Sequence, residues 1–146
     1  MAREMNLLEP ELLEKLAVFG MRMAQRKIPF LVTCTGRTQA EHNAYYAQGR
    51  EPLEKVNKLR EKAKLWPITE QENRKPVTWT KKSAHLTANG KKSRAFDFVI
   101  IKNGNLMWSM CEEYQIAGGI AAALGLEWGG NWSKDNLDVF HVQLKE

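Results

Sequence analysis

Hydrophobic positions near the start of the chain follow first a helical and then a strand-like pattern. Between residues 10 and 26 apolar side chains recur every three or four positions, which predicts an amphipathic helix. The recurring residues are Leu12, Leu16, Phe19 and Met23. Pro10 suits the first turn of this helix, where the N–H that proline lacks would have no intrahelical partner. Residues 28–34 are apolar and β-branched, and they predict a short buried strand.

The middle of the chain changes from a capped helix to a charged, proline-containing stretch. Thr38 and Glu41 have the spacing of a capping box, which predicts a helix from near Gln39 that stops near Gly49. Residues 50–80 are rich in charged side chains and carry three prolines. Four apolar positions predict one short helix within this stretch: Leu53, Val56, Leu59 and Ala63. We expect the stretch to be a flap-like excursion from the core, since long connections in compact domains usually have a function.

The last third of the chain alternates between strand and helix patterns. Residues 95–101 predict a strand, and Asn103-Gly104 is a hairpin signal with residues 106–108 as the returning strand. Ser109 and Glu112 suggest a second capping box, with a helix over residues 110–124. Further strands are expected at 126–128 and 138–144, separated by a loop at 129–136. Hairpin-linked strands and segregated helices indicate a single α+β domain, with helices packed on a small antiparallel sheet.

Two polar residues interrupt apolar faces of the predicted strands. In the last strand Phe140, Val142 and Leu144 alternate with a second set that contains Val139, His141 and Gln143. Asp97 lies between Phe96 and Phe98, where an unpaired acid is costly unless it binds a cation. If the two strands are neighbours, Asp97 and His141 point into one cleft.

His85 lies before the Asp97 strand and completes a candidate metal site. Two histidines and a carboxylate are a common ligand set for catalytic zinc, which activates water and polarises a carbonyl. Asp138, three residues before His141, is a candidate general base, although a regular strand would place it on the opposite face. A purely structural interpretation remains open, with a core His141, a capping Asp138 and a salt-bridged Asp97. His42 is expected to face solvent from its helix.

The order of these residues resembles a known family of zinc peptidases. Ser83-x-His85, Ala95-x-Asp97 and Asp138-x-x-His141 are similar to the signature of the D-Ala-D-Ala carboxypeptidase and L-alanyl-D-glutamate endopeptidase family. That family includes VanY-like carboxypeptidases, phage endolysins and CwlK-like wall hydrolases, and it shares the Hedgehog/DD-peptidase fold. Thr35-Gly36-Arg37-Thr38 resembles the upstream Gly-x-Arg-Ser/Thr element of the family.

The resemblance implies a role for each matching residue. His85, Asp97 and His141 would hold Zn²⁺, and Asp138 would be the catalytic acid/base. Arg37 would stabilise the developing oxyanion, and Ser83 would support the site by hydrogen bonding. Two departures from the signature stand out: the step from His85 to Asp97 is twelve residues, with an apparent insertion at 88–92, and Ser93 replaces a glycine.

Composition narrows the function further. The 146 residues carry a net charge of +5, which favours anionic partners such as a bacterial envelope or nucleic acid, but no nucleic-acid-reading motif is present. Cys34 and Cys111 do not form a Cys-x-x-Cys pair and are expected to be reduced structural thiols. Neither a secretory signal nor a membrane-inserting run is evident, so synthesis in the cytoplasm is expected. The resemblance to phage endolysins then implies a phage or prophage origin and action on the wall after holin-type release.

These observations lead to one expected function and two rivals. The expected enzyme is a monomeric zinc metallopeptidase that cleaves peptidoglycan stem peptides, most simply as an endolysin-like L-alanyl-D-glutamate endopeptidase. A D,D-carboxypeptidase on the same scaffold is the alternative enzyme, and a non-catalytic, zinc-stabilised wall-binding or phage structural protein is the alternative from another class. Trp128 and Trp132, which flank the loop before the last strand, are candidates for lining the substrate cleft.

Overall fold

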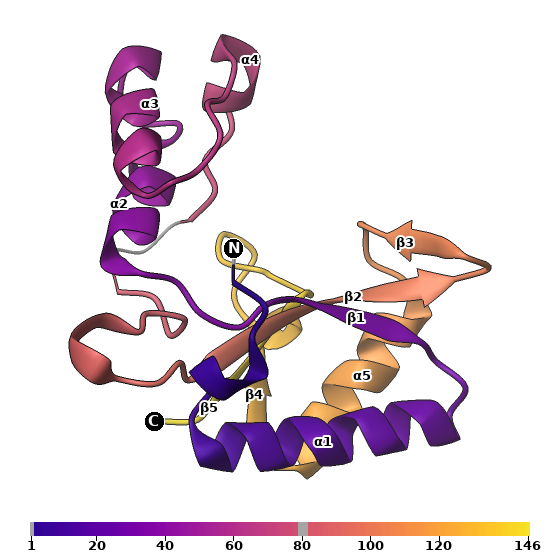
Figure 1. Cartoon of the computed structure of the whole chain (residues 1–146). Coiled ribbons are helices and arrows are strands. Elements are labelled where there is room, and N and C mark those ends of the chain that lie inside the picture. The colour runs from indigo at the N-terminus through magenta and orange to yellow at the C-terminus, as the bar shows by residue number, and fades with distance from the viewer. Residues whose placement is uncertain (1, 79–81) are drawn as a thin grey trace.

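The computed structural model describes residues 2–78 and 82–146, which fold into helices around one sheet (Figure 1). Its helices are α1 (Pro10–Gln25), α2 (Gln39–Ala47), α3 (Leu53–Lys62), α4 (Glu70–Asn73) and α5 (Glu112–Ala123). Its strands are β1 (Phe30–Cys34), β2 (Ala95–Lys102), β3 (Asn105–Met107), β4 (Leu126–Trp128) and β5 (His141–Leu144). Single turns of 3-10 helix lie at Met5–Leu7, Ala88–Gly90 and Gly129–Asn131.

The sheet is antiparallel throughout its described strands. Strands β1, β2, β5 and β4 lie in that order, and β3 also pairs with β2 through the hairpin at Asn103-Gly104. Helices α1 and α5 lie together against one face of the sheet (Figure 1). The predicted α+β class with helices on a small antiparallel sheet is therefore confirmed. Among the described residues, no helix has both the length and the apolar character needed to cross a bilayer.

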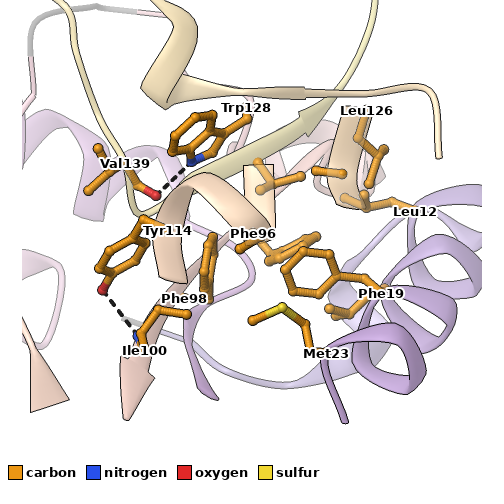
Figure 2. Close-up of a cluster of buried hydrophobic side chains, with 14 of the residues drawn as sticks. Leu12, Phe19, Met23, Phe96, Phe98, Ile100, Tyr114, Leu126, Trp128 and Val139 are labelled. Atoms are coloured by element: carbon orange, nitrogen blue, oxygen red, sulfur yellow. Dashed lines mark hydrogen bonds between the residues drawn. The ribbon is translucent and has the colours of Figure 1, made fainter. Parts of the chain in front are cut away.

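The hydrophobic core lies between the sheet and these two helices (Figure 2). Phe96, Phe98 and Ile100 project from β2 into this core, as their alternation predicts, and each is fully buried. Tyr114 of α5 is also buried, and its hydroxyl accepts a hydrogen bond from the Ile100 amide and donates one to the Met107 carbonyl. Because successive residues of a strand face opposite sides, this packing directs Asp97 away from the helices.

Helix α5 packs closely on β4 at Gly118, whereas the adjacent Gly119 faces open space. A Cβ at Gly118 would lie 2.2 Å from Cε3 of Trp128, whereas one at Gly119 would meet no atom of the described residues within 4 Å. We expect Gly118→Ala to lower the free energy of unfolding by about 1–3 kcal/mol through overpacking. Gly119→Ala is expected to raise it, by up to about 1 kcal/mol, through helix propensity. Urea denaturation measures both, and equal effects would contradict this account.

Residues 50–78 form a separate lobe of α3 and α4 beside α2, projecting from the sheet (Figure 1). Helix α3 agrees with the single helix predicted there, whereas α4 was not predicted from the sequence. The base of this lobe is closed by side-chain amides: Gln48 Nε2 donates to the carbonyls of Glu72 and Lys75, and Asn73 Nδ2 donates to that of Glu51. Residues 79 and 80, the end of the predicted excursion, lie outside the described residues.

Two predicted boundaries near the C-terminus are wrong. Helix α5 begins at Glu112 with Cys111 at its N-cap, so Ser109 does not cap it. Strand β5 begins at His141 instead of residue 138, because a turn at Val139 and Phe140 precedes it. This turn places Val139 in the hydrophobic core instead of on the face of His141, where strict alternation had placed it.

Candidate metal centre

The site begins with a cross-strand pair on the sheet face opposite the helices. Asp97 of β2 and His141 of β5 are register partners. Directly opposed side chains lie close together on an antiparallel sheet. Nδ1 of His141 is accordingly 3.1 Å from Oδ1 of Asp97. The sequence-based expectation that these residues point into one cleft agrees with the observed pairing.

His85 reaches the same carboxylate from the segment before β2. The amide of Arg37 donates to the His85 carbonyl at 2.8 Å, and the amide of Thr87 donates to the Arg37 carbonyl at 3.0 Å. Ser83 supports the segment from within, since its Oγ accepts the His85 amide at 3.2 Å. As a result, Nε2 of His85 lies 3.1 Å from Oδ1 of Asp97, the same oxygen that His141 contacts.

The apparent insertion at residues 88–92 leaves this arrangement intact. Its two ends are tied together, because the amide of Arg94 donates to the Ala84 carbonyl at 2.8 Å. Asn89 and Gly90 form an exposed turn with positive φ angles. Ser93 is buried, and its hydroxyl donates to the Ala95 carbonyl at 2.8 Å. The extra residues therefore extend outward between His85 and Asp97.

Asp138 is brought to the site by the turn that precedes β5. An oxygen of Asp138, an oxygen of Asp97 and a ring nitrogen of His141 all lie within 4.8 Å of one another. The Asp138 carboxylate accepts the Phe140 amide at 3.1 Å, which fixes the side chain within the turn. Gly129 makes room for this turn, since a Cβ there would lie 2.2 Å from the Asp138 carbonyl oxygen.

The site combines groups whose pKa values are displaced in opposite directions. Burial acts to raise the pKa of Asp97, but the imidazoles of His85 and His141 outweigh it and hold that pKa below its ordinary value. Burial acts to lower the pKa of His141, but the hydrogen bond and charge of Asp97 raise it overall. The pKa of Asp138 is raised by burial and then by the negative charge of Asp97. A carboxyl group with a raised pKa is suited to accepting and returning a proton.

These shifts predict how the stability of the metal-free protein depends on pH. Because the pKa of Asp97 is lowered in the folded state, its carboxylate stabilises the fold above pH 3.8, and this stabilisation is lost as the pH falls. Because the pKa of His141 is raised, its imidazolium stabilises the fold below pH 6.5, and this stabilisation is lost as the pH rises. We therefore expect the free energy of unfolding, measured in urea with a chelator present, to fall as the pH rises from 6 to 9 as His141 loses its proton. Asp97→Asn is the control, because it removes the partner charge and should flatten the profile. A wild-type profile no steeper than that of Asp97→Asn would contradict the assignment.

A cleft of about 700 Å³ opens onto these residues. Arg37, Lys82, Trp132 and Leu137 contribute to its walls. The Trp132 ring centroid lies 5.0 Å from that of His141, in agreement with its predicted position in the cleft. Trp128 lies in the core instead, where its indole N–H donates to the Val139 carbonyl at 2.8 Å (Figure 2). The expectation that Trp128 lines the cleft is therefore wrong, because that ring packs against α5.

Comparison with solved structures finds a similar fold. The fold is similar to that of ChiX, an L-Ala D-Glu endopeptidase of Serratia marcescens. The TM-score is 0.55 at 21% sequence identity, over 97% of this chain and 83% of ChiX. The expected DD-peptidase-like fold is thus confirmed. No family profile matches the chain, and no curated protein matches it.

Cys34 is a site neighbour that sequence reasoning missed. It lies at the end of β1, and its Sγ is 3.8 Å from Nδ1 of His85. Burial raises the pKa of Cys34 to about 11, with a further contribution from Asp97, so the group remains a thiol at neutral pH. Sγ of Cys34, a nitrogen of His85 and an oxygen of Asp97 also lie within 4.8 Å of one another. The available signal was the position of Cys34 in the buried strand that leads to Gly36-Arg37.

His42 is placed differently from expectation. It was expected to face solvent, but it is 1% exposed within α2. It lines a pocket between α2 and α3 together with Asn43, Tyr46 and Leu59. Helix α3 packs on the face of α2 that carries His42, and the spacing of apolar residues within α2 does not predict this contact. His42 therefore lies between α2 and α3, and it is not among the described residues that line the cleft.

Proposed function

We propose that the protein is a zinc-dependent peptidase of peptidoglycan stem peptides, with L-alanyl-D-glutamate as the bond cleaved. The observation that carries the proposal is the approach of two imidazole nitrogens, from His85 and His141, to within 3.1 Å of one Asp97 oxygen. A tetrahedral zinc ion with bonds of about 2.0–2.1 Å holds its ligand atoms roughly 3.4 Å apart. Each of the two separations from Asp97 is close to that value, and each imidazole belongs with Asp97 to a group of possible ligand atoms within 4.8 Å of one another.

The donor set also suits zinc chemically. Nε2 of His85, Nδ1 of His141 and Oδ1 of Asp97 would hold the ion, and two nitrogens with one carboxylate oxygen are typical of catalytic zinc sites. These residues line the cleft, so the remaining coordination position would be reached from it. Zinc bound there would acidify a water molecule and polarise the substrate carbonyl.

Asp138 would act as the general base and then as the general acid. It lies on the cleft wall within the reach of Asp97 and His141, and the burial and negative charge that raise its pKa favour uptake of a proton. Its carboxylate would take a proton from the attacking water and deliver it to the amine that leaves. Its hydrogen bond from the Phe140 amide would hold it in place during both transfers.

Arg37 would stabilise negative charge that develops on the scissile carbonyl. It is 7% exposed, it lines the cleft, and its guanidinium lies 5.1 Å from the centroid of the Tyr45 ring. Stacking on an aromatic face and a backbone bridge to His85 hold this cation in a fixed place. A preorganised cation loses little free energy in reorganising as the oxyanion forms.

The substrate assignment rests on similarity and on charge. ChiX is described as an L-Ala D-Glu endopeptidase, and this chain has a similar fold. Its proposed zinc ligands also follow the order His85, Asp97, His141. The net charge of +5 favours approach to an anionic cell wall. We also propose that the protein acts as a monomer and degrades the cell wall as phage endolysins do.

The test is digestion of purified peptidoglycan with the zinc-loaded protein, followed by mass spectrometry of the new termini. We expect free L-alanine carboxyl ends and new D-glutamate amino ends. Release of terminal D-alanine would instead identify a D,D-carboxypeptidase. Binding to the wall with zinc and without new termini would overturn the peptidase proposal in favour of a wall-binding protein.

A further inference from the structure

The second ring nitrogen of His141 contacts Gln143, which in turn contacts Glu127, and both lie outside the proposed ligand set. Nε2 of His141 lies 2.8 Å from Oε1 of Gln143, and Nε2 of Gln143 donates to Oε2 of Glu127 at 2.9 Å. Glu127 of β4 and Gln143 of β5 are register partners, so the sheet itself sets this spacing. The three side chains form a hydrogen-bonded row across β4 and β5.

The chemistry of the row fixes the direction of each hydrogen bond. An ionised carboxylate accepts hydrogen bonds and does not donate them, so Gln143 presents its NH₂ group to Glu127. The amide oxygen of Gln143 therefore faces His141 and requires a proton on Nε2. Nδ1 faces an oxygen of Asp97, so both ring nitrogens of His141 face acceptors in the metal-free protein. A cation bound at Nδ1 would take the place of the Nδ1 proton, while the Nε2 proton stays hydrogen-bonded to Gln143.

We propose that Glu127 and Gln143 are positioning residues that fix the tautomer and ring orientation of His141 so that Nδ1 is available for zinc. The inference rests on the proposed zinc site. Groups that orient a metal-binding histidine in this way typically change metal affinity by about 10- to 100-fold. His85 is held differently, because the neighbour of its Nδ1 is the Cys34 thiol at 3.8 Å, a weak hydrogen-bonding group.

The first test removes the acceptor. Gln143→Leu is expected to weaken zinc binding about 10- to 100-fold, measured by competition with a chromophoric chelator. Gln48→Leu is the matched control: the Gln48 amide also makes two hydrogen bonds, but it lies at the base of the lobe and should leave zinc affinity unchanged. Thermal melting checks that each variant folds, and Glu127→Ala, with a smaller loss of affinity, replaces Gln143→Leu should the latter fail to fold.

The second test exchanges the two side chains. Gln143→Glu alone places two carboxylates in contact and should weaken zinc binding. The double variant Glu127→Gln/Gln143→Glu restores the row, with the new glutamine donating to the new glutamate and the glutamate accepting from His141. We expect the double variant to recover the affinity lost in Gln143→Glu. Additive losses in the double variant would overturn the proposal.

A readout without metal separates this inference from the proposed function. Nitrogen–proton NMR of the metal-free protein detects the ring N–H protons of each histidine. We expect the Nε2 proton of His141 to be hydrogen-bonded and slow to exchange in wild type and to lose this protection in Gln143→Leu, while the ring protons of His85 are unchanged. A His141 Nε2 proton that is equally protected in Gln143→Leu overturns the inference. A wild-type protein with the protected Nε2 proton that binds no zinc overturns the proposed function instead.

Discussion

Replacing Asp138 by asparagine is expected to lower the rate of peptide hydrolysis by about 10²- to 10⁴-fold while zinc remains bound. Asparagine keeps the shape and the oxygen that accepts the Phe140 amide, so the turn before β5 should persist. It cannot take a proton from water at neutral pH. The three proposed zinc-holding side chains are untouched, and the affinity for zinc should therefore change little.

The Asp138 experiment has a matched control on the same loop. Asp135→Asn makes the same chemical change at an exposed position, and we expect wild-type turnover from it. Single-turnover rates on a defined muropeptide, together with zinc content by atomic emission, measure the two effects separately. Wild-type turnover by Asp138→Asn would remove the acid/base role from this residue and require another group in the cleft.

Replacing His85 by alanine is expected to abolish both zinc binding and hydrolysis. This side chain supplies one of the two nitrogens beside Asp97, and two remaining donors hold zinc poorly compared with three. Zinc that binds the folded state raises wild-type stability by about 2.7 kcal/mol when its free concentration is 100 times the dissociation constant. Addition of zinc should therefore raise the melting temperature of wild type and leave that of His85→Ala unchanged.

His42→Gln controls for the loss of any buried histidine. His42 is as buried as His85 but lines the pocket between α2 and α3. This variant should keep the zinc-induced rise in melting temperature even if its baseline stability falls. A zinc-induced rise of wild-type size in His85→Ala would show that the ion binds elsewhere, and would contradict the proposed site.

Local periodicity was enough to predict most of the sheet and half of the site geometry. Phe96 and Phe98 are apolar, so their burial forces Asp97 to the opposite face, and the same argument orients His141 within β5. The capping box of Thr38 and Glu41 forms as expected, with both reciprocal hydrogen bonds. These features depend on neighbours in sequence, which is why the sequence alone predicts them.

Features that depend on tertiary contacts were predicted less well. The position of Asp138 results from a turn that buries Val139 in the core, and the alternation of a regular strand does not predict such a turn. His42 is buried because α3 folds back over α2. The contact between Cys34 and His85 joins residues 51 positions apart, so no local pattern announces it.

The closed base of the lobe has a consequence for how the chain tolerates change. Gln48 and Asn73 join the two ends of the lobe through hydrogen bonds to main-chain carbonyls, and Gly49 packs on Pro76. We expect residues 53–71, beyond this neck, to tolerate changes in length and sequence that leave these hydrogen bonds in place. The lobe is a natural place for grafting: a foreign segment whose ends match the neck can alter what the protein approaches while the floor of the cleft stays as it is.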